Sequence, residues 1–199
     1  MFNLPTSTEI SKPLYKKAVF EKFNIKAAER ERFDADVSHM ALVNYVSPSR
    51  VPALKEGAEI KDFYVLQVAL KHCEFDSRNI QMLQKFIPQH ILFALQYNDQ
   101  TKLCVFHTRF LQSEWRNSSD VFIPLKGITL DEVWNNIVAE IGSLDATSEQ
   151  AIEEQIIKNE QREKLLKQIE LLEKQCRSER QMHKKYELHK QILKLKEKI

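Results

Sequence analysis

The sequence predicts an α+β fold: a mostly antiparallel or mixed sheet with flanking helices, followed by a long C-terminal helix or coiled coil. Strand-like runs succeed one another with few helices between them, which favours antiparallel or mixed pairing over a parallel sheet. Only 3 of the 199 residues are Gly, a scarcity that disfavours folds built on glycine turns and glycine phosphate loops. Residues 148–199 contain neither Gly nor Pro, which is typical of a long helix.

Changes in composition divide the chain into three segments. Pro5 and several small polar residues predict an N-terminal arm or loop over 1–11. The α+β domain is expected over 12–142. A linker and the long C-terminal coiled-coil helix are expected over 143–199.

Hydrophobic periodicity and breaker residues predict the elements of the α+β domain. Capping residues set the helix boundaries: Ser77 begins one helix, Thr129 forms a capping box with Glu132, and Gly142 ends the last helix as its C′ residue. The expected order is helices 13–23 and 24–33, strands 37–46 and 59–72, helix 77–87, strands 90–98, 102–110 and 121–125, and helix 128–142.

The C-terminal segment carries apolar residues at heptad-like spacing in two series that are out of phase. Leu165 and Leu172 belong to the first series, Leu188 and Leu195 belong to the second, and the seam is interrupted over 177–187. A register shift, an opening of the coil or a turn between two helices would each explain the interruption. A turn usually recruits Gly, Pro or Asn and none is present, so we expect one continuous helix, straight or kinked. The residues expected to bind a partner are Leu165, Ile169, Leu172, Leu188, Ile192 and Leu195.

Charge is balanced over the chain but partitioned along its C-terminal segment. The 30 Lys and Arg nearly match the 28 Asp and Glu, so no strong general attraction to nucleic acid or anionic lipid is expected. The net charge is −3 over 148–173 and +6 over 174–199. These signs suit the helix dipole and favour antiparallel pairing if the helix self-associates. In the alternative interpretation the basic end binds nucleic-acid phosphates. The residues for that alternative are Arg177, Arg180, Lys184 and Lys185.

Glu59 and Lys61 suggest a second alternative, a metal-dependent nuclease. At the start of a strand, their spacing of two puts both side chains on one face. Such enzymes add a second carboxylate that holds Mg²⁺, which Asp34, Asp36 or Asp62 could supply. A chain with 29% charged residues produces this pattern by chance. No catalytic residue is therefore assigned, and Mg²⁺ is expected only under this alternative.

Other patterns predict no metal site, cofactor or nucleophile. The sequence contains no GxGxxG, GxxxxGK[ST], HExxH or paired CxxC motif. Its three cysteines are odd in number and far apart, so no disulfide framework is implied. Cys104 and His107 would lie on opposite faces of a strand, and Cys104 is expected in the core. Trp115 lies in a polar loop, where it is either an exposed contact residue or a buried anchor.

Three segments carry a resemblance to a known family: LPTSTEISKPLYKK near the start, IPQHILFAL in the middle and LEKQCRSERQMHKKYELHKQILKLKEKI at the end. Together they resemble the bacterial family called domain of unknown function 4391, over nearly the whole chain. The family's polar-then-apolar pattern matches at Glu179, Arg180, Gln181, Lys185, Glu187, Leu188, Leu195 and Lys196. The resemblance implies no particular activity. It implies that members of the family are encoded beside genes for helicases, DNA methyltransferases and restriction-type systems.

These observations predict a non-catalytic accessory protein of a bacterial DNA-processing or anti-phage defence assembly. The expected partner is a protein, such as a helicase or DNA methyltransferase, or a second copy of the chain, docked through the C-terminal helix. The N-terminus has no apolar run long enough for a signal peptide, and the longest apolar stretches are strand-length. A cytoplasmic protein without a membrane partner is therefore expected.

Overall fold

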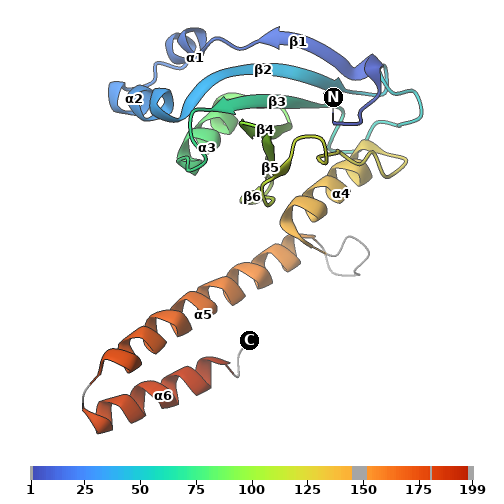
Figure 1. Ribbon diagram of the computed structural model, residues 1–199. Coiled ribbons are helices and arrows are strands. Elements are labelled where there is room, and N and C mark those ends of the chain that lie inside the picture. The colour runs from blue at the N-terminus through green and yellow to red at the C-terminus, as the bar shows by residue number, and fades with distance from the viewer. Residues whose placement is uncertain (1, 145–151, 180, 197–199) are drawn as a thin grey trace. The chain divides into compact units, whose positions relative to one another are not determined.

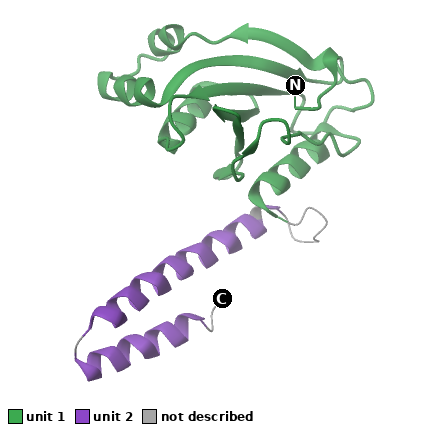
Figure 2. Ribbon diagram, viewed as in Figure 1, with its two compact units in different colours: residues 1–147 green, residues 148–199 purple. Residues whose placement is uncertain are grey.

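The computed structural model describes residues 2–144, 152–179 and 181–196. It comprises two compact units, unit 1 over residues 1–147 and unit 2 over residues 148–199, shown in two colours in Figure 2. Unit 1 carries the sheet and unit 2 carries two helices.

Within residues 2–144, unit 1 is built on a seven-stranded mixed sheet (Figure 1). The strand order is β1-β2-β3-β4-β5-β6, and β7 also pairs with β5. Neighbouring strands are antiparallel except β3 and β4, which are parallel because a helix crosses over between them. The mixed α+β fold predicted from the sequence is therefore confirmed. The strands are β1 (Glu9–Pro13), β2 (Val37–Val46), β3 (Phe63–Leu70), β4 (Ile91–Tyr97), β5 (Gln100–Phe106), β6 (Phe110–Gln112) and β7 (Arg116–Asn117).

The helices of unit 1 cover both faces of this sheet. Residues from α1, α2 and α3 join one hydrophobic cluster with alternate residues of β3 and β4, whereas α4 packs on the opposite face. The helical segments are η1 (Thr6–Thr8), α1 (Lys16–Lys22), α2 (Ala27–Asp36), α3 (Ser77–Phe86) and α4 (Leu130–Gly142).

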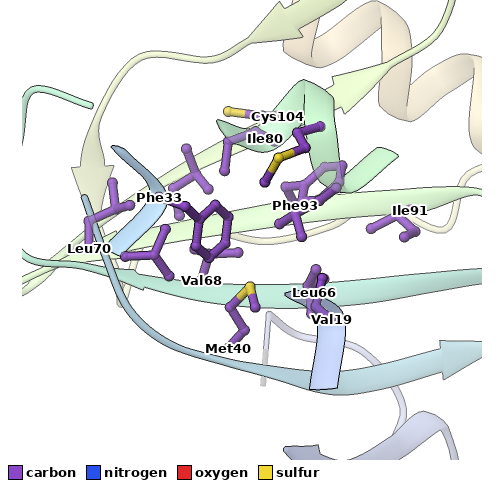
Figure 3. Packing of buried hydrophobic residues seen from close by; sticks show 14 of the residues in the cluster. Val19, Phe33, Met40, Leu66, Val68, Leu70, Ile80, Ile91, Phe93 and Cys104 are labelled. Atoms are coloured by element: carbon purple, nitrogen blue, oxygen red, sulfur yellow. The ribbon is translucent and has the colours of Figure 1, made fainter. Parts of the chain in front are cut away.

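The core between the sheet and α1–α3 is drawn in Figure 3. Leu66 and Val68 alternate along β3 and belong to the same cluster as Phe33 of α2, whose ring has no exposed surface (Figure 3). The rings of Phe20 and Phe33 meet edge to face at 5.6 Å, an arrangement that aromatic quadrupoles favour. Cys104 is fully buried in this cluster, as predicted, and burial raises the pKa of its thiol to about 12.

The apolar stripe of α4 closes the other face of the sheet. Phe63 and Val65 point away from the α1–α3 core because successive strand residues alternate in direction. The ring centroid of Phe63 lies 5.4 Å from that of Trp134, and the ring centroid of His90 lies at the same distance from it. The stripe predicted from the sequence is buried at each of its positions, which are Leu130, Val133, Trp134, Ile137, Val138 and Ile141.

Of the three helix-capping residues predicted from the sequence, the structure has one in the predicted role and places the other two roles on neighbouring residues. Thr129 is the N-cap of α4, and its hydroxyl accepts a hydrogen bond from the Glu132 backbone N–H at 3.3 Å, as predicted. The left-handed residue that ends α4 is Ser143 rather than Gly142. Asp76 caps α3 in place of Ser77, because its carboxylate accepts the Arg78 backbone N–H.

Two further sequence predictions for unit 1 differ from the structure. The sequence predicts an arm or loop over residues 1–11, yet Glu9–Pro13 pairs with β2 as an edge strand, because the outer edge of β2 offers backbone partners. Residues 121–125 form no strand. Val121 and Ile123 are buried with the alternation of a strand, but Ile123 donates its backbone N–H to the carbonyl of Phe2 rather than to a sheet neighbour.

Unit 2 contains α5 (Ile152–Ser178) and α6 (Met182–Lys196), which pack side by side as a helical hairpin (Figure 1). The prediction of one continuous helix is therefore wrong, although a long C-terminal helix is present as α5. The chain reverses inside the interrupted seam, because the reversal lets the two apolar series face each other: Ile169 and Ile192 are only 5% and 4% exposed. Lys196 closes the hairpin with an ion pair to Glu173 at 2.9 Å. The coiled-coil part of the prediction stays a prediction.

Candidate functional site

Glu59 and Lys61 lie in the loop before β3 rather than on the strand, because β3 begins only at Phe63. Both side chains are exposed. The loop is held by Asp131 of α4, whose carboxylate accepts three consecutive backbone N–H groups. The distances are 2.6 Å from Ala58, 3.3 Å from Glu59 and 2.8 Å from Ile60. The strand geometry that would align Glu59 with Lys61 is therefore absent.

The three carboxylates considered as partners of Glu59 have other contacts. Asp34 forms an ion pair with Lys16, and Asp62 accepts a hydrogen bond from the hydroxyl of Tyr45 at 3.2 Å. Asp36 belongs to a separate polar network. Over the described residues, no group of three or more His, Cys, Asp or Glu side chains is arranged to hold a metal ion. The pair of Glu59 and Lys61 thus has no part in the function proposed below.

Replacing Asp131 by alanine is expected to destabilise the protein by about 1–2 kcal/mol, since three backbone donors lose a charged acceptor and become partly solvated instead. The hydrogen bond from Ile60, followed by those from Ala58 and Glu59, lowers the pKa of Asp131. A carboxyl group whose pKa is lower in the folded than in the unfolded chain stabilises the fold above its ordinary titration range. This contribution is lost as the pH falls through the folded-state pKa.

Urea unfolding of wild type and Asp131→Ala near neutral pH and in acid would check both parts of this expectation. The difference between the two proteins should shrink in acid. The matched control is Asp120→Ala, because Asp120 is exposed and accepts its hydrogen bond from the adjacent Ser119. An Asp131→Ala difference that is independent of pH would contradict the assignment.

A buried polar network around Asp36 joins α2 to the start of α3. One carboxylate oxygen of Asp36 accepts the side-chain N–H of Asn79 at 2.6 Å and the backbone N–H of Asp76 at 2.8 Å. The other lies 3.3 Å from Nε2 of His72. Arg32 completes the network by donating to the Asn79 amide oxygen at 3.0 Å. These contacts satisfy the buried groups within the chain, so we interpret the network as structural.

Asp76 lies where this network reaches the surface. Its carboxylate accepts from Nε of Arg78 at 2.9 Å. That side-chain hydrogen bond is the largest influence on Asp76 and lowers its pKa to about 2. Asp76 is therefore ionised throughout the neutral range, which suits its position at the N-terminus of α3.

Trp115 serves as a partly buried anchor of its loop. It packs against the hydrophobic cluster of unit 1, and the amine of Lys102 lies 5.2 Å from its ring centroid. A cation at that distance over an indole face is a favourable contact. Of the two alternatives open from the sequence, the anchor is the one that the structure supports.

The six residues expected to bind a partner lie at or beside the contact between α5 and α6. Ile169 and Ile192 are buried, and the remaining four are partly buried: Leu165, Leu172, Leu188 and Leu195. Their role in binding a partner stays a prediction. The packing of α5 against α6 already covers part of the apolar surface from which the sequence predicts a binding partner.

A second apolar stripe on α6 faces solvent and is absent from the residues that the sequence predicts as a binding surface. Met182, Tyr186 and Leu193 are 80%, 66% and 49% exposed. They follow the helical spacing i, i+4, i+11 and so lie along one side of α6. The signal was available as this spacing, but the stronger series containing Ile192 masked it. Three large apolar side chains aligned on one exposed helix face are typical of an interaction surface.

The same face of the hairpin includes part of α5. A shallow hollow of about 280 Å³ is lined by Glu173 and Arg177 of α5 and by His189 and Leu193 of α6. Helical spacing puts Leu166, which is 49% exposed, on the side of α5 that carries Glu173 and Arg177. We call this face the hairpin face. It consists of Leu166, Glu170, Glu173, Arg177, Met182, Tyr186, His189 and Leu193.

The basic residues considered for nucleic-acid binding do not form one patch. Arg177 is exposed and lies 4.0 Å from Glu173. Lys185 lines the hollow of the hairpin face, whereas Lys184 lines a different hollow formed with Gln175 and Gln191. Arg180 lies outside the described residues. Among the residues that are described, these cations are therefore divided between different sides of the hairpin.

The fold and the hairpin face define a class of protein: a mixed α+β domain joined in sequence to a helical hairpin that exposes an apolar stripe on α6. Over residues 2–199 the chain matches the model of the family described as Domain of unknown function (DUF4391), and it belongs to that family. This confirms the resemblance noted in the sequence. No curated protein and no solved structure matched the chain. None of the described helices has the length and apolar run that a membrane span requires.

Proposed function

We propose that this protein is a non-catalytic interaction protein that pairs with a second copy of itself through the hairpin face of unit 2. The observation that carries the proposal is the exposed stripe of Met182, Tyr186 and Leu193 on α6. Leaving such a stripe in water costs free energy that burial against another helix recovers, at about 25 cal/mol per Å² of apolar surface.

Charge on the hairpin face favours a second copy as the occupant. On α5, Leu166 is followed by Glu170 and Glu173 on the same side of the helix. On α6, the stripe lies beside Lys185 and Lys190. Within one chain Glu170 pairs with Lys174 and Glu173 pairs with Lys196. A two-fold arrangement would bring Lys185 and Lys190 of one copy beside these glutamates in the other and extend the pairs into a self-complementary, isologous contact. Four helices packed in this way would resemble a four-helix bundle.

The triple variant Met182→Ser, Tyr186→Ser, Leu193→Ser is expected to weaken self-association of the full chain by at least about tenfold, since three apolar side chains leave the contact. Light scattering coupled to size-exclusion chromatography over a range of concentrations would measure the mass. The matched control is Leu171→Ser, because Leu171 is 57% exposed but lies on another side of α5.

Two results would decide the proposal. A wild-type dimer that becomes monomeric in the triple variant but not in Leu171→Ser supports it. A wild-type monomer at high concentration, or a dimer that the triple variant leaves intact, would contradict it. Raising the salt concentration should also weaken the dimer, because its charged margins are exposed.

We further propose that the dimer serves as an accessory subunit of a bacterial DNA-processing or anti-phage defence assembly. This part of the proposal rests on the resemblance noted in the sequence, which implies genes beside those for helicases, DNA methyltransferases and restriction-type systems. Affinity capture from nuclease-treated host lysate, with the wild-type chain as bait, should retain a helicase or a DNA methyltransferase identified by mass spectrometry. If neither enzyme is retained, the accessory role is contradicted. The dimer is tested separately, by the light-scattering measurement.

A further inference from the structure

An open groove lies on unit 1, on the face of the sheet that α1 and α3 partly cover. Its volume is about 510 Å³. Leu42, Tyr64 and Ile91 form its floor, where β2, β3 and β4 lie side by side. The walls come from α1 and the end of α3, and they meet where the rings of Phe23 and Phe86 stack at 4.5 Å.

The groove exists because neither wall helix extends over this end of the sheet. Helix α1 has only seven residues, and α3 ends at Phe86, two residues before Pro88, which cannot continue a helix. The floor and walls are therefore apolar but only partly covered. Ala18 and Gln89 on the rim are exposed, which leaves the groove open along its side.

The charge around the groove has one sign. Lys12 from β1 and Lys22 from α1 both line it and are exposed, and the lining residues include no aspartate or glutamate. Among the described residues neither lysine forms an ion pair, and the amine of Lys22 lies 5.4 Å from the Phe23 ring centroid. An apolar floor with two unpaired ammonium groups is complementary to a ligand that joins apolar groups with carboxylates.

We infer that this groove docks a partner protein through a short segment in which large apolar side chains alternate with Asp or Glu, laid across Leu42 and Ile91 with its carboxylates toward Lys12 and Lys22. The mode is that of a peptide or amphipathic helix that inserts several side chains into a hydrophobic groove. The inference concerns unit 1 only and is independent of the hairpin face.

The open form of the groove favours a peptide segment over a small anionic amphiphile such as a fatty acid. Small-molecule sites usually enclose 70–90% or more of their ligand. This groove is exposed along its rim, so a single acyl chain would keep one side in water. A peptide covers the rim with its own backbone while its side chains fill the floor.

A random peptide library displayed on phage would test the inference on the full chain. Peptides selected on the wild type should carry Asp or Glu beside Leu, Ile, Phe or Trp. Their affinity should fall at least about tenfold in the double variant Lys12→Glu, Lys22→Glu, since each reversal replaces an attraction by a repulsion. It should fall similarly in Ile10→Glu, which adds a carboxylate to the groove while leaving the buried cluster intact.

Matched controls separate the groove from general surface charge. Lys17→Glu changes the same charge on α1 outside the groove lining, where the side chain is 88% exposed, and should leave the selected peptides bound. Selection on the doubly reversed variant should enrich Lys and Arg instead. Peptides that bind all of these variants equally, or a library that yields no binder, would overturn the inference. Displacement of the selected peptides by dodecanoate at lower concentration than by free peptide would assign the groove to an amphiphile and also overturn it.

Discussion

Alanine in place of Trp134 is expected to lower the free energy of unfolding by about 3–5 kcal/mol. The indole is 1% exposed, and the rings of Phe63 of β3 and of His90 each lie 5.4 Å from it, so it packs α4 against this face of the sheet. Truncation leaves a cavity that the surrounding rigid elements cannot fill by relaxation. Equilibrium unfolding in guanidinium chloride, followed by circular dichroism, would measure the loss.

The matched control for Trp134→Ala is Phe122→Ala. Phe122 is also a large aromatic residue of unit 1, but it is 48% exposed, so its removal should change stability by no more than about 0.5 kcal/mol. A similar loss in both variants would mean that α4 does not depend on its aromatic anchor.

Removing the Asp36 carboxylate is expected to cost about 2–4 kcal/mol, because two donors lose their acceptor in a buried environment. Those donors are the side-chain amide of Asn79 and the backbone N–H of Asp76, at 2.6 and 2.8 Å. Thermal and urea unfolding of Asp36→Ala would give the value. We expect the loss to be larger than that of an ordinary surface aspartate.

Asp34→Ala is the matched control for this prediction, since Asp34 lies on the same helix but forms a partly exposed ion pair with Lys16. Its loss should be about 0–1 kcal/mol. A double-mutant cycle with Asn79→Ala should give a coupling free energy of about 0.5–3 kcal/mol, as expected for side chains in one hydrogen-bonded network. If Asp36→Ala is as mild as Asp34→Ala, the network does not hold α2 to α3.

The sequence was sufficient for features that depend on neighbouring residues. The apolar stripe of α4 repeats every three or four residues, and its N-cap Thr129 directly precedes the helix. The short polar turn between β4 and β5 also involves only neighbouring residues. The cores of β3 and β4 could be located because long apolar runs indicate strands buried on both faces. The family also follows from the chain's own pattern over residues 2–199.

The candidate surfaces depended on contacts between distant segments. The exposed stripe on α6 could be separated from the buried series only once α5 had provided a partner for Ile192. The groove of unit 1 is lined by Ile10 of β1 and by Ile91 of β4, two strands that are separated by β2 and β3 in the sheet. No local sequence pattern predicts that these two residues line the same groove. The network that places Asp36 beside Asn79 likewise joins two helices that are separated by two strands.

Local periodicity therefore accounts for the helix α4 and the strands β2 to β5, since each of these elements repeats its pattern over 3.6 or 2 residues. It could not show that residues 177–187 contain a reversal, because the reversal uses no Gly or Pro and is favoured by long-range burial of Ile169 and Ile192. It likewise missed the edge strand at Glu9–Pro13, whose pairing depends on the free edge of β2. Side-chain spacing is a property of the chain, whereas a seam, a groove or a sheet edge exists only after distant segments have packed together.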